Sequence, residues 1–163
     1  MTEQPNVSFH VEIADGVSGK TFLVSGVIDE NADLSFLESI GDHARLNLKN
    51  VRRINSYGVR AWIEAIRSIP KGTTFELIEC PPSVVDQINM VAGFAGRGKV
   101  VSFYAPMACD HCAYEEDHLF YVADFRNNDG KLPEVLCPRC GHRLEVDDLE
   151  EQYLLFARES GSP

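Results

Sequence analysis

Two Cys-x-x-Cys pairs in the last third of the chain constrain its fold more than any other feature. Cys109 and Cys112 form the first pair, and Cys137 and Cys140 form the second pair 24 residues further on. Each short turn can direct two thiolates at one ion, so two turns can close a tetrahedral shell around Zn²⁺. Gly141 follows the second pair and can adopt the positive φ that such a turn often needs. The spacing therefore predicts a small zinc-binding unit.

A complete shell of four thiolates leaves no position for water or substrate, so the expected Zn²⁺ is structural and not catalytic. Other interpretations stay open from the sequence. The thiols can be unligated core residues, either pair can be a redox dithiol, and iron can take the place of zinc. His111 or His142 can also replace one cysteine. The fifth cysteine, Cys80, stands apart, and we expect a small buried residue there because no sequence feature supplies a base.

The acidic charge of the chain is concentrated in the segment that holds the paired cysteines. Residues 1–105 carry 10 Lys/Arg and 12 Asp/Glu, whereas residues 106–163 carry 5 and 13. Such a surface repels phosphate backbones, which argues against nucleic-acid binding, and it suits a basic protein partner. The sequence contains no apolar run of membrane-spanning length and does not start with a signal-peptide pattern. We therefore expect a cytoplasmic protein without direct membrane insertion.

Strand-like and helix-like segments alternate over the first hundred residues. The pattern predicts strands at 22–28, 46–49, 75–78 and 100–104, and helices at 31–40, at 57–69 and from Ser83 onward. The clearest helix carries one apolar stripe at helical spacing, formed by Val59, Trp62, Ile63, Ile66 and Ile69. This alternation predicts an α/β fold, with a layered domain of mixed sheet and flanking helices over residues 1–105.

Pro106 marks the expected boundary to a second domain, residues 106–163. Between the cysteine pairs, segments 119–125 and 132–136 are predicted to form a β-hairpin around the turn-rich residues 127–130. The last segment, Asp147 to Arg158, can be a helix or a strand. A helix is favoured because acidic residues gather at its start and Arg158 lies near its end, which matches the helix dipole.

The stretch from Phe22 to Phe103 resembles the STAS domain (sulfate transporter and anti-sigma factor antagonist) in the order of its elements. The matching order is the strand 46–49, a loop at 51–55, the helix 57–69, the strand 75–78 and a helix entered after Pro82. The sequence Cys137-Pro-Arg-Cys140-Gly141 is similar to the second knuckle of a zinc ribbon. The resemblance implies a STAS-like layered domain followed by a zinc ribbon.

In STAS domains the loop before this helix typically carries a Ser or Thr that a partner kinase phosphorylates, and the phosphate controls docking. Ser56 matches that position; Asn55 stands where an acid is usual, and Tyr57 where a small residue is usual. The resemblance implies a phosphoacceptor at Ser56 and a partner-binding surface of Asn55, Tyr57, Gly58 and Arg60. The residues alone also allow Ser56 to be a helix N-cap, which stabilises a helix by about 1 kcal/mol. A phosphate there would meet the positive end of the helix.

These features predict a non-enzymatic regulatory or adaptor protein with the zinc ribbon as a second interaction surface. The resemblance implies a kinase or an anti-sigma-like regulator as partner. The chain lacks a Gly-x-Ser-x-Gly motif, a P-loop and a dinucleotide fingerprint, and its 5 histidines show no triad or metal spacing. Two alternatives stay open: a small STAS-like subunit of a membrane transport complex, and a nucleic-acid-binding zinc ribbon. A homodimer is open as well.

Overall fold

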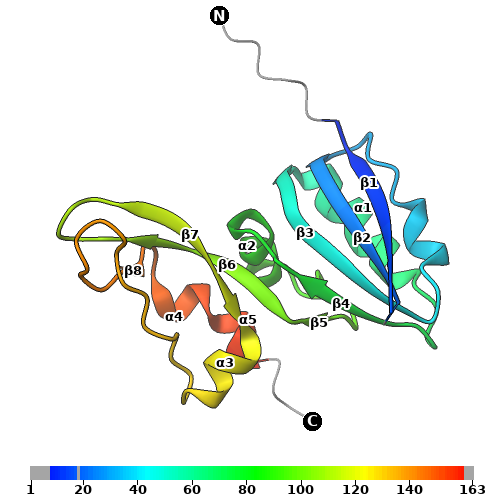
Figure 1. The fold of residues 1–163 in the computed structure, drawn as a ribbon. Coiled ribbons are helices and arrows are strands. Elements are labelled where there is room, and N and C mark those ends of the chain that lie inside the picture. Colours follow the sequence, from blue (N-terminus) through cyan, green and yellow to red (C-terminus); the bar gives the residue numbers. More distant parts are fainter. Residues whose placement is uncertain (1–7, 18, 160–163) are drawn as a thin grey trace, which may run out of the picture.

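The structure is a computed structural model that describes residues 8–17 and 19–159. Two sheets lie side by side in a mixed α/β fold, one with five strands in the order β1-β2-β3-β4-β5 and one with three in the order β7-β6-β8 (Figure 1). The strands are β1 (His10–Gly16), β2 (Gly19–Ile28), β3 (His43–Ile54), β4 (Thr74–Ile78), β5 (Lys99–Val100), β6 (Ser102–Ala108), β7 (Glu115–Tyr121) and β8 (Glu145–Val146).

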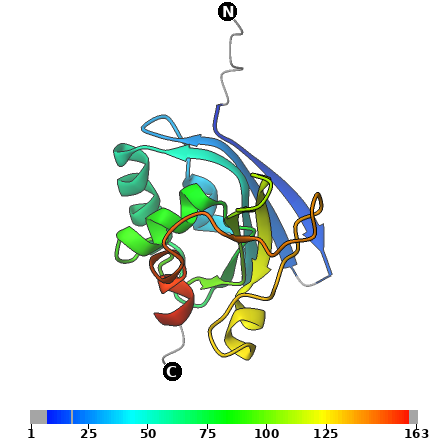
Figure 2. The same cartoon turned by 90° about the vertical axis from the view of Figure 1, so that its left-hand side faces the viewer.

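The helices lie mainly on one side of these sheets (Figure 2). They are the 3-10 helix η1 (Ser35–Ser39) and the α-helices α1 (Ser56–Arg67), α2 (Pro82–Met90), α3 (Val122–Asn127), α4 (Glu150–Tyr153) and α5 (Leu155–Glu159). None of the helices in the described ranges combines the length and apolar character that crossing a membrane requires.

The larger sheet is mixed because β1 pairs antiparallel with β2, whereas β2, β3, β4 and β5 are parallel neighbours. Buried and less buried residues alternate along its central strands, so one face of the sheet turns to the core. Phe22, Val24 and Ile28 on β2 are buried on that face, as are Leu46 and Leu48 on β3. The helices α1 and α2 cover it, as expected for strands that alternate with helices.

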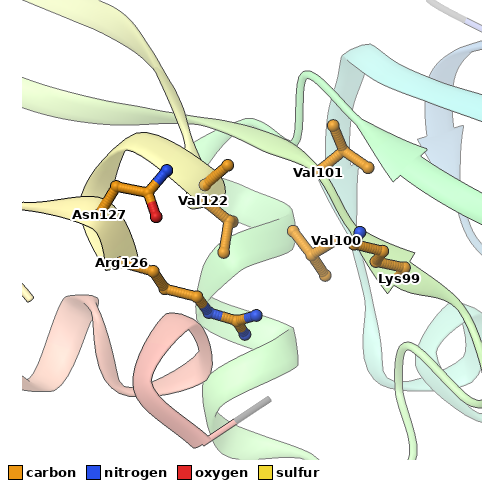
Figure 3. A pocket seen from close by; sticks show the side chains of 7 residues that line it. Lys99, Val100, Val101, Val122, Arg126 and Asn127 are labelled. Carbon is orange, nitrogen blue, oxygen red and sulfur yellow. The ribbon is translucent and has the colours of Figure 1, made fainter. Parts of the chain in front are cut away.

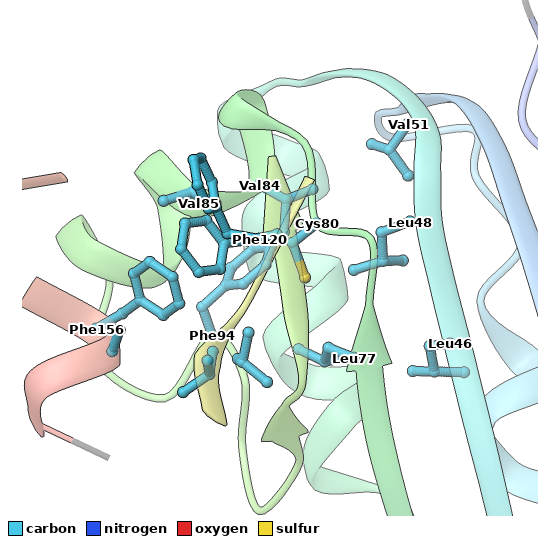
Figure 4. Close-up of a cluster of buried hydrophobic side chains, with 14 of the residues drawn as sticks. Leu46, Leu48, Val51, Leu77, Cys80, Val84, Val85, Phe94, Phe120 and Phe156 are labelled. Carbon is cyan, nitrogen blue, oxygen red and sulfur yellow. The ribbon is translucent and has the colours of Figure 1, made fainter. Parts of the chain in front are cut away.

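The core continues from the larger sheet into the smaller one without a break (Figure 4). Cys80, just after β4, forms a parallel bridge with Phe103 of β6. The Phe103 ring lies 5.9 Å from that of Phe120 on β7 and 5.0 Å from that of Phe156 on α5, between ring centroids. The residues that join the sheets are therefore large aromatic side chains packed on one another.

The strands predicted at 22–28 and 75–78 and the helix predicted at 57–69 are confirmed as β2, β4 and α1. The strand predicted at 46–49 is longer, because β3 runs to Ile54 and takes in most of the expected loop at 51–55. The helix predicted at 31–40 is wrong, since only the 3-10 helix η1 forms there. The carboxylates of Asp29 and Asp33 accept hydrogen bonds from the backbone N–H groups of Asn31 and Ser35, which favours turns over a helix.

The strand predicted at 100–104 is confirmed in part: its residues are extended, but β5 and β6 divide the segment between the two sheets. Glu79, at the end of β4, has φ 51 and interrupts the pairing of β4 with the segment beside it. Pairing resumes at Cys80, whose N–H donates to the Ser102 carbonyl at 3.1 Å. The helix predicted from Ser83 onward is confirmed as α2, which begins one residue earlier at Pro82 and has no side-chain cap.

The hairpin predicted between the cysteine pairs is wrong. Residues 122–127 form α3, and segment 132–136 contributes only an isolated bridge from Leu136 to Arg143. Val122 and Phe125 are buried at helical spacing, which explains why this stretch turns into a helix. The actual hairpin pairs β6 with β7, and β6 runs through position 106, where the sequence suggested a domain boundary.

The terminal helix favoured by the sequence is confirmed as α4 and α5. Both short helices pack on α2, and Asn89 of α2 joins them. Its amide nitrogen donates to the Tyr153 carbonyl at 2.9 Å, and its amide oxygen accepts from the Phe156 N–H at 2.9 Å. The C-terminal segment is thereby fixed to α2, the helix that follows β4 of the larger sheet.

Candidate metal centre

The first cysteine pair forms the turn of the β6–β7 hairpin. The Cys109 N–H donates to the Tyr114 carbonyl at 2.8 Å, and the Ala113 N–H donates back to the Cys109 carbonyl at 2.9 Å. Ala113 has φ 62, in the left-handed region. Its side chain makes this conformation more costly than it would be for glycine, so the turn is held by its surroundings.

The second pair repeats this geometry in the loop before β8. The Cys137 N–H donates to the His142 carbonyl at 2.7 Å, and the Gly141 N–H donates to the Cys137 carbonyl at 2.9 Å. Gly141 has φ 76, which confirms the positive φ expected from the sequence. The two turns are thus equivalent, with Ala113 and Gly141 at matching positions.

The two turns bring all four sulfurs into one cluster. The Sγ atoms of Cys109 and Cys140 are 3.4 Å apart, those of Cys112 and Cys137 are 3.5 Å apart, and all four lie within 4.8 Å of one another. None of the four forms a disulfide. Cys109 and Cys137 are buried, and the other two are partly exposed. The four cysteines can therefore hold a metal ion, as their spacing predicts.

Neither His111 nor His142 belongs to this cluster, which consists of cysteines alone among the described residues. Instead the two exposed imidazole rings stack on each other, with their centroids 3.9 Å apart. A second contact joins the turns, because the Arg139 guanidinium lies over the Tyr114 ring at 5.3 Å. These cross-contacts were not predicted, since residues 25 or more positions apart show no local pattern that pairs them.

The surroundings of the sulfurs favour removal of a proton from Cys137. Burial raises the pKa of this thiol, but the backbone N–H groups of Cys140 and Arg139 and the neighbouring thiols outweigh that effect and lower the pKa to about 7. At Cys140, the His142 N–H favours the thiolate, but burial and the three other cysteines raise the pKa to about 12. Four adjacent thiols resist full deprotonation on their own, and a bound cation removes that repulsion.

The other predicted site residues lie at the start of α1. Asn55, not Ser56, is the N-cap: its Oδ1 accepts a hydrogen bond from the Gly58 N–H at 2.8 Å. The amide nitrogen of Asn55 donates to Glu30 at 3.0 Å, and this bond lowers the pKa of the Glu30 carboxyl. The capping role that the sequence allowed for Ser56 is therefore wrong. Ser56 occupies the first helical position instead.

Ser56, Tyr57 and Arg60 are exposed, and the exposed fraction of Tyr57 is 69%. Within the described part of the chain, the Ser56 hydroxyl has no hydrogen-bond partner. Gly58, in contrast, is buried, and a Cβ atom there would lie 1.9 Å from the Ile28 carbonyl oxygen. The structure thus places three of the predicted residues on one surface and uses Gly58 for close packing.

Cys80 is fully buried at the junction of the sheets, as expected for a small core residue. Burial raises the pKa of its thiol to about 12, so the reactive thiolate is disfavoured at neutral pH.

No protein-family model matches this chain, and no match was found among curated proteins.

Proposed function

We propose that this protein is a non-enzymatic regulatory adaptor that docks on a protein partner through the start of α1, with phosphorylation of Ser56 as the switch. The observation that carries the proposal is that Asn55 caps the helix while the Ser56 hydroxyl is exposed and has no partner in the described residues. The serine is therefore not needed to form α1, and a kinase can reach it. The resemblance of residues 22–103 to STAS domains supports the same role.

A phosphate on Ser56 would add negative charge beside a group of exposed arginines. Arg60 lies one helical turn further on, and Arg52 and Arg53 are exposed at the end of β3. The positive end of the α1 dipole adds to this charge. A phosphate brings about two negative charges, which would offset these cations. Tyr57, the residue after Ser56, is exposed and offers an aromatic contact to a partner.

We assign Zn²⁺ as the metal of the four-cysteine cluster. Tetrahedral zinc with Zn–S distances of about 2.3 Å places its sulfurs about 3.8 Å apart. The observed separations, from 3.4 Å to no more than 4.8 Å, bracket that value. Zinc with four thiolates is a structural cross-link without an open position for catalysis. In this proposal the zinc cross-link holds residues 106–163 in the shape of a second interaction surface.

The role of Ser56 is tested in the native cell. We expect mass spectrometry of the isolated protein to find a phosphate on Ser56. We also expect quantitative affinity purification to recover one partner with an abundance that differs about tenfold between Ser56→Ala and Ser56→Asp, because charged contacts of this kind contribute roughly 1.5–3 kcal/mol.

Ser68 provides the matched control. It is exposed at the opposite end of the same helix, and its hydroxyl donates to the Ala65 carbonyl at 2.6 Å. The variants Ser68→Ala and Ser68→Asp should recover that partner equally. An unmodified Ser56, together with equal recovery by the two Ser56 variants, would exclude the switch.

A further inference from the structure

A pair of adjoining cavities lies where the larger sheet meets the C-terminal helices. The first, of about 230 Å³, is formed between the strand end at Lys99–Val101 and the helix α3 (Figure 3). The second, of about 340 Å³, shares Lys99, Val100 and Arg126 with the first and extends to Ile88 of α2 and Phe156 of α5. We refer to both together as the Lys99 cavities.

The described lining of the Lys99 cavities is positively charged, although the protein is strongly acidic. The chain has 25 Asp/Glu against 15 Lys/Arg, yet none of the described residues that line either cavity is acidic. Lys99 forms no ion pair with any carboxylate in the described ranges. Arg126 is held in place, because its Nε donates to the Ala157 carbonyl at 3.3 Å. Two cations thus face the same space, which favours an anion between them.

The rest of the lining is aliphatic. Val100 and Val101 line the first cavity from the strand and Val122 lines it from α3, and among the described lining residues the Asn127 amide is the only uncharged polar side chain (Figure 3). Ligand sites of this kind, with an apolar lining and a few polar groups at one end, suit a ligand with an apolar body and a charged head. Phe156, the one aromatic residue in the described part of the lining, is buried and offers no open face for stacking.

The glycine-rich loop beside the second cavity does not indicate a phosphate site. A Cβ atom on Gly96 would lie 2.2 Å from Ile66, and one on Gly98 would lie 2.4 Å from Phe75. Packing against these two side chains therefore explains both glycines. A single negative charge on an aliphatic body fits the lining better than a phosphoryl group does.

We propose that the Lys99 cavities bind a small aliphatic carboxylate, with the carboxylate between Lys99 and Arg126 and the chain against the valines. The lining comes from β5 and α2, which precede residue 106, and from α3 and α5, which follow it. A bound carboxylate would therefore hold these two parts of the chain together. The site is separate from the Ser56 surface and does not depend on the function proposed there.

Methyl NMR of the full chain loaded with zinc tests this proposal, with octanoate as the probe. We expect octanoate to shift the Val100 and Val122 methyl signals saturably. Octanol, which has the same body without the charge, should bind about tenfold more weakly, since charge-assisted hydrogen bonds are among the strong ones. Inorganic phosphate, a charge without the body, should leave the valine signals unchanged.

Two variants locate the charge. Lys99→Gln should weaken octanoate binding about tenfold, and Asn127→Asp should also weaken it by placing a negative charge at the first cavity. Lys71→Gln is the matched control, because Lys71 is an exposed lysine that lines a neighbouring cavity but neither of these two. Equal binding of octanoate and octanol, equal affinities of the Lys99→Gln and Lys71→Gln variants, or shifts confined to other methyl groups would overturn the proposal.

Discussion

Asn55 and Ser56 are neighbours with similar capping chemistry, and α1 uses only Asn55. Either side-chain oxygen can accept a hydrogen bond from the first turn of a helix, so local sequence does not separate them. What separates them is a contact from another strand: the Asn55 N–H donates to the Ile28 carbonyl at 3.2 Å. That bond fixes Asn55 as the last extended residue, and the helix begins one residue later.

The same close approach explains why position 58 must be glycine. In Gly58→Ala, the new Cβ would lie 1.9 Å from the Ile28 carbonyl oxygen, a backbone atom that cannot move away easily. We expect a loss of about 3 kcal/mol in the free energy of unfolding, measured by urea denaturation. Gly72→Ala is the control, because a Cβ atom there meets nothing within 4 Å, and its effect should be within about 0.5 kcal/mol. Similar stabilities of the two variants would contradict this account of Gly58.

At the scale of elements, the sequence predicted those whose pattern is local. The apolar stripe of α1 and the β-branched run of β2 identify their own type, because burial on one face produces the period directly. The strand β6 was misjudged because Pro106 suggested a break. The Pro106 carbonyl accepts a hydrogen bond from the Asp147 N–H, and β8 pairs only with the next two residues, Met107 and Ala108. The missing N–H of the proline faces the β8 side of the strand beyond the end of that pairing, so the proline costs little there.

The attachment of the C-terminal helices to α2 depends on Asn89. In Asn89→Ala, the Phe156 N–H and the Tyr153 carbonyl both lose their partner in a partly buried place. We expect a loss of about 2 kcal/mol in stability and faster hydrogen exchange at the Phe156 amide. Asn128→Ala is the control, because Asn128 is exposed and its amide makes one bond, to the Lys131 carbonyl. Unchanged exchange at Phe156 would show that Asn89 does not hold these helices.

For the whole molecule, the metal cluster was the most predictable part and the joining of the sheets the least. Each half of the cluster is a four-residue turn, so its chemistry is visible in the sequence and only the approach of the two turns is long-range. The position of β6 depends on Cys80, Phe120 and Phe156, which are separated from Phe103 by 17 to 53 residues. The local periodicity of apolar residues in the sequence does not indicate such long-range contacts.

Zinc removal should act on one part of the molecule first. We expect elemental analysis to find one zinc per chain, and chelation to speed hydrogen exchange in the two cysteine turns and β8 while β2 and β4 stay protected. Acid should act like a chelator, because protons compete with zinc for thiolates.

Cys112→Ser should lower the zinc content, whereas Cys80→Ala, which removes a thiol outside the cluster, should retain it. A metal-free wild-type protein would refute the assignment.

The packing of Phe103 limits where the chain can be cut without exposing its core. A chain cut after Ala105 would keep Phe103 but lose Phe120 and Phe156, the two rings that cover it. It would expose an aromatic residue that is fully enclosed in the intact protein. A gene fusion that replaced only residues 106–163 would have to supply other side chains to cover Phe103. We therefore expect residues 1–105 and 106–163 to have evolved as one unit.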